Sequence, residues 1–385
     1  MVLALAIITL LLLPGSPARA GWEIQNPIPT KNQLRAVWAG SATDVFAVGD
    51  YGTILHYDGI SWSGITLGAY NIYGVWGTSG TDVFAVADKG IILHYDGITW
   101  NNMSSGTAQR LRDVWGFSPT DVFVTGENGT TLHYDGTTWS RMSNATSLTL
   151  QGVWGISGDD LYAVGGSSAS TGPGNDIIVH YDGITWTLEY TGGLARLHDV
   201  WGSSATDIFS VGESGGIFHY DGATWTGANN PVNGNSAITL RDIWGASEQD
   251  IFAVGDSGTV LRYDGTQWET MNSKTGVKLH GVGGSSASDV FAVGEDGTII
   301  RYDGVDDDGS NGACLFTAIL GRGSPQLDTL RRVRDEGLVK SAAGRQLAAL
   351  YYAWGRHCIP LVERQPLLRQ AAKRLLEALL PFFAN

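Results

Sequence analysis

The chain of 385 residues contains only two cysteines, Cys314 and Cys358. Neither a disulfide framework nor a cysteine-based metal site can therefore form in the first 313 residues. For the two thiols themselves, two interpretations stay open: a disulfide between them in an oxidising compartment, or modification of Cys314. A single pair without a histidine cluster is a poor metal site, and we expect neither a metal nor another cofactor.

Basic residues are also scarce, with 24 lysines and arginines against 38 acidic residues and a net charge of −14. The imbalance lies in residues 21–309, which hold 12 basic and 33 acidic residues, whereas residues 310–385 hold 11 and 5. Because phosphate binding requires a basic surface, the acidic part argues against nucleic acid as a partner. Much of the acid is aspartate that recurs in turns, where it has a structural role.

Residues 1–20, MVLALAIITLLLLPGSPARA, contain an apolar run that is too short for a typical membrane span. The run is followed by proline and glycine and then by Ala-Arg-Ala before Gly21, a pattern typical of a secretory signal cleaved after Ala20. No cysteine follows this point, which argues against a lipoprotein. We expect an exported protein that is periplasmic, displayed on the outer surface or secreted.

A sequence repeat of about forty residues recurs through the chain, and residues 111–139, LRDVWGFSPTDVFVTGENGTTLHYDGTTW, are a clear copy of it. Its short apolar runs are bounded by Gly, Ser, Asp and Asn, so each copy predicts four antiparallel strands. Seven copies with this period are typical of a β-propeller. The first-strand tryptophan slot is filled by Trp38, Trp76, Trp115, Trp154, Trp201 and Trp244, with Gly283 in the seventh copy.

The seventh copy lacks the fourth-strand tryptophan, while an extra Trp22 precedes the first copy. The segment around Trp22 is therefore predicted to complete the last blade and close the ring. We predict an all-β fold, a seven-bladed propeller over 21–304 closed by an N-terminal strand. A linker over 305–312 and a small all-α domain over 313–385 follow.

Residues that recur in every copy are expected to be structural. The tryptophans are assigned to the packing between blades. Five histidines occupy one slot, one per blade, too far apart to share a metal ion, and we expect each to bond an aspartate of its own blade. The Asp-Gly turns before the fourth strand, such as Asp135-Gly136, resemble the Asp-boxes of sialidase-like propellers, in which the box is a turn.

Function is expected where the copies differ. Blade four carries eight extra residues between its second and third strands, and four extra residues follow blade five; both insertions are predicted on one face. A variable polar position on the innermost strands is predicted around the channel mouth of that face. Two interpretations stay open, a site for an anionic or sugar-like ligand and a merely hydrated rim. The candidate residues are Arg35, Tyr73, Arg112, Gln151, His198, Arg241 and His280.

In the C-terminal part a helical period replaces the period of two, and Ser324-Pro325 is a helix start signal. Candidate helices cover 325–336, 342–354, 357–364 and 366–380. The last one is amphipathic, which suits either a small bundle or peripheral contact with a membrane surface.

The repeat V-W-G-S-S-x-x-D-V-F-A-V-G with its H-Y-D-G continuation, over residues 22–304, resembles exported propeller proteins that are abundant in myxobacteria. The photosystem II assembly-factor-like propellers resemble it as well. The tail from Ala313 is similar to the bacterial CFI-box domain, although Cys314-Leu315-Phe316 departs from C-F-I and GRGSP replaces Y-G-S-P. These resemblances imply a location at the cell envelope rather than an activity.

Two hypotheses follow from these patterns. The first is an exported, non-catalytic binding or scaffold protein that presents its loop-rich face to a protein or glycan, with the tail retaining it at the envelope. The second is a glycoside hydrolase of the sialidase-like kind, with Tyr73, Arg35 and Arg112 as the nearest match to the required residues. Asp113, Asp199 and Asp242 recur at one blade position, which indicates packing or turn duty.

Overall fold

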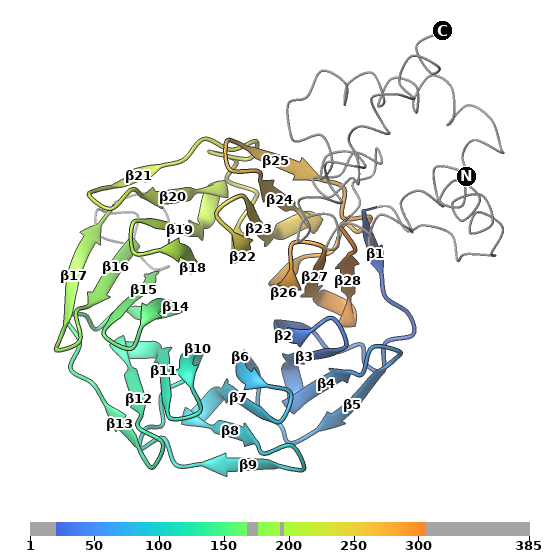
Figure 1. Cartoon of the computed structure of the whole chain (residues 1–385), viewed down its shortest axis with the longest axis horizontal. Coiled ribbons are helices and arrows are strands. Elements are labelled where there is room, and N and C mark those ends of the chain that lie inside the picture. The colour runs from blue at the N-terminus through green and yellow to red at the C-terminus, as the bar shows by residue number, and fades with distance from the viewer. Residues whose placement is uncertain (1–20, 168–175, 193–195, 305–385) are drawn as a thin grey trace, which may run out of the picture. The chain divides into compact units, whose positions relative to one another are not determined.

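The computed structural model describes residues 21–167, 176–192 and 196–304. The predicted signal peptide, linker and helical domain, with Cys314 and Cys358, lie outside the described residues. Residues 23–301 form a compact unit that contains seven four-stranded antiparallel sheets arranged as blades around a central channel (Figure 1). The prediction of a seven-bladed propeller is therefore confirmed.

The first strand of each blade lies at the channel and the fourth at the rim (Figure 1). Blade one comprises β2 (Leu34–Ser41), β3 (Asp44–Gly49), β4 (Thr53–Tyr57) and β5 (Trp62–Thr66). Blade two comprises β6 (Ile72–Ser79), β7 (Asp82–Ala87), β8 (Ile92–Tyr95) and β9 (Trp100–Met103). Blade three comprises β10 (Leu111–Ser118), β11 (Asp121–Gly126), β12 (Thr131–Tyr134) and β13 (Trp139–Arg141). Blade four comprises β14 (Thr149–Ser157), β15 (Asp160–Gly166), β16 (Asp176–Tyr181) and β17 (Trp186–Thr191).

The remaining blades follow the same order. Blade five comprises β18 (Leu197–Ser204), β19 (Asp207–Gly212), β20 (Ile217–Tyr220) and β21 (Trp225–Gly227). Blade six comprises β22 (Leu240–Ser247), β23 (Asp250–Gly255), β24 (Val260–Tyr263) and β25 (Trp268–Met271). Blade seven comprises β26 (Leu279–Ser286), β27 (Asp289–Gly294), β28 (Ile299–Tyr302) and β1 (Trp22–Ile24). Short 3₁₀ turns follow the second strand in six blades: η1 (Asp50–Gly52), η2 (Asp88–Gly90), η3 (Glu127–Gly129), η4 (Glu213–Gly215), η5 (Asp256–Gly258) and η6 (Glu295–Gly297).

The last blade takes its outer strand from the amino end of the described chain, as predicted. Its strand order is β1-β28-β27-β26. Trp22 is fully buried, with its ring centroid 5.6 Å from that of Tyr302. The backbone N–H of Gln25 donates to the carbonyl of Ile299 at 2.8 Å. Pairing the two ends of the ring leaves no open sheet edge between the first and last blades.

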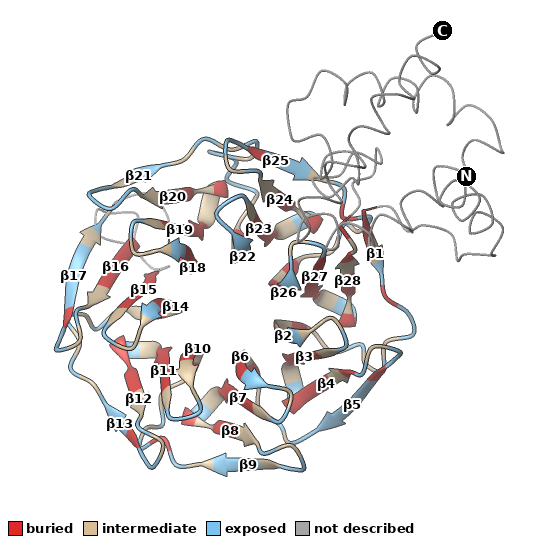
Figure 2. Cartoon of the chain, viewed as in Figure 1, coloured by how far each residue is buried: buried red, intermediate tan, exposed pale blue. Residues whose placement is uncertain are grey.

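Apolar burial concentrates in the middle strands of the blades, while the outer strands expose much of their length (Figure 2). The first-strand tryptophans pack between blades, and five of the rings, those of Trp38, Trp76, Trp154, Trp201 and Trp244, cross to the following sheet. A Cβ atom added at Gly116 would lie 2.6 Å from the ring of Trp76, and one at Gly245 would lie 2.5 Å from Trp201. At these five joints the tryptophan of the W-G pair on one blade packs against the glycine of the W-G pair, or of its equivalent, on the next blade.

The recurring histidines hydrogen-bond within their own blades, as predicted. His56 Nε2 and Asp44 Oδ1 are 2.7 Å apart, and the imidazole stacks on Phe46 with a centroid distance of 4.4 Å. Four further blades repeat this contact, and Arg262 and Arg301 replace the histidine in blades six and seven. The Asp-Gly turns are also turns, since Asp58 Oδ1 accepts from the N–H groups of Ile60 and Ser61 at 2.8 Å. These backbone donors lower the pKa of Asp58.

Candidate binding site at the central channel

The connections from second to third strands and those between blades share one face, which we call the loop-rich face. In blade three the N–H of Gly129 in η3 donates to the carbonyl of Leu148 at 2.8 Å. In blade five the N–H of Gly215 donates to Ile238, and Asn230 Nδ2 donates to the carbonyl of Gly215 at 3.0 Å. The four-residue insertion after blade five therefore packs on η4. The blade-four insertion falls mostly on residues 168–175, outside the described residues.

The seven candidate residues predicted from the variable position lie near the start of the innermost strands, and we call them the mouth ring. Each is followed fifteen residues later by the residue after the second strand, which is acidic in six blades. Arg35 Nε donates to Asp50 at 2.5 Å, and Arg241 Nε donates to Asp256 at 2.8 Å. Arg112 Nη2 donates to Glu127 at 2.8 Å. The arginines of the mouth ring are therefore paired with acids.

Further cations join these pairs from the position before the innermost strand. Arg110 Nε donates to Asp88 at 2.5 Å and Arg110 Nη1 to Glu127 at 3.1 Å. Lys278 Nζ lies 3.5 Å from Glu295. Positive and negative groups alternate around the rim, so the mouth ring does not present an excess of positive charge. The fifteen-residue spacing is the sequence signal that would have indicated this pairing.

Tyr73 is enclosed by the arginines of its neighbours. The guanidinium carbons of Arg35 and Arg112 lie 4.8 and 5.0 Å from the centroid of its ring, and that of Arg110 lies at 5.3 Å. The phenol donates to Asp88 at 3.3 Å. Of the predicted ring, the structure thus brings together Arg35, Tyr73 and Arg112 as one cluster. Cation–π contacts of this kind fix the orientation of a tyrosine ring.

The two histidines of the mouth ring are held neutral. Burial lowers the pKa of His198 to about 3, and the charges of Arg196 and Arg241 act in the same direction. Burial and the charge of Arg241 also lower the pKa of His280 to about 3. Gln151, in blade four, adds no charge, and the residue fifteen positions later is Gly166 rather than an acid. The ring is therefore polar but not cationic.

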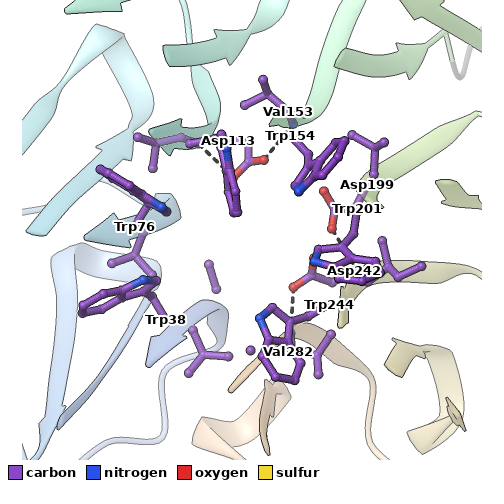
Figure 3. A pocket seen from close by; sticks show the side chains of 18 of the residues that line it. Trp38, Trp76, Asp113, Val153, Trp154, Asp199, Trp201, Asp242, Trp244 and Val282 are labelled. Atoms are coloured by element: carbon purple, nitrogen blue, oxygen red, sulfur yellow. Dashed lines mark hydrogen bonds between the residues drawn. The ribbon is translucent and has the colours of Figure 1, made fainter. Parts of the chain in front are cut away.

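Immediately inside the mouth ring, the innermost strands enclose a cavity of about 190 Å³ (Figure 3). Six indoles line it: Trp38, Trp76, Trp115, Trp154, Trp201 and Trp244. Gly283 takes the seventh place. The tryptophans assigned to packing between blades therefore also form the walls of a cavity on the propeller axis.

Three aspartates from blades three, five and six reach into this cavity (Figure 3), and we call them the channel carboxylates: Asp113, Asp199 and Asp242. Asp113 Oδ1 accepts from the N–H of Val114 at 2.8 Å, and Oδ2 accepts from Val153 of the next blade at 2.9 Å. Asp242 likewise accepts from Val282 of the next blade at 2.7 Å. The packing role inferred from the sequence is confirmed, because each carboxylate connects neighbouring blades.

The channel carboxylates lie where carboxylates are hard to ionise. Burial, with the charge of Asp199, raises the pKa of Asp113 to about 8. Burial raises the pKa of Asp242 to about 6, and it raises the pKa of Asp199 well above its ordinary value. The side chains touch a water-accessible cavity, but protein surrounds them on every other side. The three aspartates were not predicted as a site from the sequence, although their recurrence two residues before the channel tryptophan was a usable signal.

Comparison with known proteins shows the fold and not the family. No family model and no curated protein matches the chain. Among solved structures, one described as YCF48 bound to D1 peptide is similar with a TM-score of 0.61 at 17% identity, over 77% of this chain and 100% of that one. YCF48 from Cyanidioschyzon merolae gives 0.59 at 15% identity, over 74% and 99%. The WD40 β-propeller domain of Doa1 gives 0.58 at 14% identity, over 74% and 97%.

The described residues contain neither a candidate membrane span nor a candidate metal site. Within residues 21–167, 176–192 and 196–304, no helix is long and apolar enough to span a membrane. In the same ranges no group of three or more histidine, cysteine, aspartate or glutamate side chains is arranged to hold a metal ion. The channel carboxylates are thus a charge cluster without metal-site geometry.

Proposed function

We propose that this protein is an exported, non-catalytic binding protein that presents the loop-rich face of its propeller to a protein partner at the cell envelope. The observation that carries the proposal is the mouth ring, in which six blades place a polar side chain and an acid side by side around one opening. Charges arranged in this way select the orientation and identity of a partner more than they add affinity.

The likeness to other propellers supports a binding role. One similar structure is described as bound to a peptide, and its fold covers most of this chain. Identity is low, so the partner of that protein is not transferred to this one. Export is inferred from residues 1–20, and retention at the envelope is inferred for the helical tail. A glycan remains a second class of partner for the same face.

Site-specific photocrosslinking on the full-length protein in the cells that produce it tests the face. Tyr51 in η1 is 63% exposed on the loop-rich face, and Ile60 in the turn after β4 is 90% exposed on the opposite face. A photoreactive residue at position 51 should give a discrete crosslinked product in the envelope fraction, and one at position 60 should not. Crosslinks only from position 60 would place the partner on the wrong face for this proposal. Absence of the protein from the periplasm, the envelope and the medium would refute export.

A glycoside hydrolase is the second candidate, because Tyr73, two arginines and Asp88 form one cluster. A sialidase-like enzyme needs a tyrosine nucleophile, arginines and an acid. The phenol here lies between guanidinium groups that are already paired with acids. Chromogenic sialosides and neutral glycosides provide the test, with Tyr73→Phe as the matched control. Turnover that disappears in Tyr73→Phe would favour the enzyme over the binding protein.

A further inference from the structure

We propose that the cavity on the propeller axis binds an alkylammonium cation, with its charged head among Asp113, Asp199 and Asp242 and its apolar stem among the tryptophans. The inference goes beyond the proposed function, because it concerns the inside of the channel rather than the loop-rich face. It does not depend on the identity of any protein partner. It follows from charge, from the lining of the cavity and from the order of the residues along the innermost strands.

The ionisable groups that line the cavity are all acids. Its lining includes three carboxylates from three blades and no lysine, arginine or histidine. The carboxylates face one another, and the pKa values of all three are raised. A cation with N–H donors would supply the missing opposite charge and favour the ionised carboxylates. Each carboxylate accepts backbone N–H groups yet keeps lone pairs for a ligand, since an ionised carboxylate offers about four acceptor positions.

The tryptophans supply the second part of the site. Aromatic faces attract organic cations and cover apolar stems. Along each innermost strand the aspartate position precedes the tryptophan position by two residues, which separates the two levels by roughly 7 Å of strand. The carboxylate level lies next to the mouth ring, and the tryptophan level lies toward the opposite face. This separation is comparable to a four-carbon stem, so a ligand entering from the opposite face would bring its ammonium group to the carboxylates.

A purely structural role does not account for the carboxylates. The equivalent position is Ala36, Gly74, Gly152 and Gly281 in the other four blades. Four of the seven blades therefore join their neighbours without a carboxylate there. Gly152 is also required to be small, because a Cβ atom at that position would lie 2.4 Å from Asp199 Oδ1. The acids are restricted to one side of the channel, where they face one another.

Calorimetric titration of the full-length protein with n-butylammonium chloride at pH 8 tests the proposal, with indole fluorescence as a second readout. We expect saturable binding of one cation per chain. The neutral isostere 1-pentanol and sodium chloride at equal concentration should not bind in this way. Equal binding of pentanol, or no saturable binding of the ammonium ion, would overturn the proposal.

Two variants make the test independent of folding losses. Asp199→Asn should weaken butylammonium binding at least tenfold, and the exposed turn variant Asp58→Asn is its matched control. Ala36→Asp adds a fourth carboxylate where blade symmetry offers the N–H groups of Val37 and Val75, and it should tighten binding severalfold. Unchanged affinity in Ala36→Asp, or in an Asp199→Asn protein with an intact melting transition, would show that the carboxylates only connect blades.

The source of the ammonium group is distinguished by competition. A peptide with one lysine and the same peptide with acetyllysine are each titrated against bound butylammonium. Displacement by the lysine peptide alone would assign the cavity to a protein side chain. Displacement by neither peptide, with butylammonium still bound, would assign it to a small free amine. Equal displacement of butylammonium by the lysine and acetyllysine peptides would show that the ammonium charge is not recognised, and it would overturn the proposal. None of these outcomes depends on whether the loop-rich face binds its own partner.

Discussion

The channel carboxylates each lie one residue after a member of the mouth ring on three of the innermost strands, yet the two sets handle charge in opposite ways. In the mouth ring the arginines meet acids from the 3₁₀ turns that follow the second strands, so the charges cancel. One step further in, three aspartates face one another with no basic residue in the lining. The difference shows that a repeated scaffold can carry a compensated surface and an uncompensated interior on neighbouring positions.

The contrast has a geometric cause. Residues at the mouth are within reach of the 3₁₀ turns, which bring an acid to six of the seven blades. The next residue points into the channel, where only the other innermost strands approach. Compensation there has to come from a neighbouring blade or from a ligand, and the blades provide backbone N–H groups and a side-chain hydrogen bond between Asp199 and Asp242.

Opening the ring should destroy both sites together, and it is the largest effect we predict. Trp22→Ala removes a fully buried indole from the closing strand and should cost about 3–5 kcal/mol of unfolding free energy. Denaturant unfolding measures this loss. Ile24→Ala, on the same strand but 46% exposed, should cost far less. Equal effects from the two variants would mean that β1 does not close the propeller.

The two rings should differ in what a single truncation costs. Asp113→Ala leaves the N–H groups of Val114 and Val153 without an acceptor and should cost about 1–3 kcal/mol. Glu127→Ala removes the partly exposed ion pairs with Arg110 and Arg112 and should cost about 1 kcal/mol or less. Paired thermal melts compare the two variants directly. A larger loss of stability for Glu127→Ala than for Asp113→Ala would contradict the conclusion that the channel carboxylates are buried and the mouth ring is screened by solvent.

Stability should also fall as pH rises from 6.5 to 8. The folded pKa of Asp113 is about 8 against an ordinary value of 3.8, so the folded state keeps a proton that the unfolded chain has lost. That contribution is present at low pH and disappears as pH rises through 8. Asp199 acts in the same direction, whereas the contribution of Asp242, whose folded pKa is about 6, is largely lost below pH 6.5.

His198 and His280 have the opposite effect on stability, which falls as pH drops below 6.5. In that range the histidines of the unfolded chain become protonated, whereas the buried rings of the folded state stay neutral. The free energy of unfolding of the wild type, relative to that of Asp113→Asn, should therefore fall by about 1 kcal/mol between pH 6.5 and 8. Melting curves at matched ionic strength measure it. A difference that does not change with pH would contradict the shifted pKa of Asp113.

The smallest expected effect concerns salt. Raising sodium chloride from 0.05 to 0.5 M should weaken the exposed pairs of the mouth ring by a few tenths of a kcal/mol. The difference in unfolding free energy between wild type and Glu127→Ala should therefore become smaller as salt is added. The corresponding difference for Asp113→Ala should stay constant. Parallel narrowing for both variants would indicate that salt reaches the channel carboxylates equally.

Much of the architecture could be predicted from the sequence, because the same pattern of strands and turns recurs in seven copies. The Trp22 surplus and the missing tryptophan of the last copy predicted the closure, and the His56-type contacts followed from one recurring slot. The positions of the mouth ring were also predictable. Its charge balance was missed, because the partner acids were treated as turn residues although they recur at a constant spacing.

The channel cavity was harder to predict. Whether Asp113 and Asp242 face a cavity or a neighbouring strand depends on the distance of the innermost strands from the propeller axis. A local sequence pattern does not predict that distance. The tryptophans were correctly assigned to packing, but a periodic pattern cannot show that the same rings also form walls. The blade-four insertion and the C-terminal predictions stay predictions, since they lie outside the described residues.

The indole that one blade packs against the glycine of the next gives the propeller a direction of assembly. Blades two, five and six each carry both the indole and the receiving glycine, whereas blade seven has Gly283 in the tryptophan position and blade one has Ala39 in the glycine position. A copy of one of these three blades would therefore fit beside another of them but not across the joint where the ring closes. The joint thus marks, within the sequence itself, where counting of the blades begins.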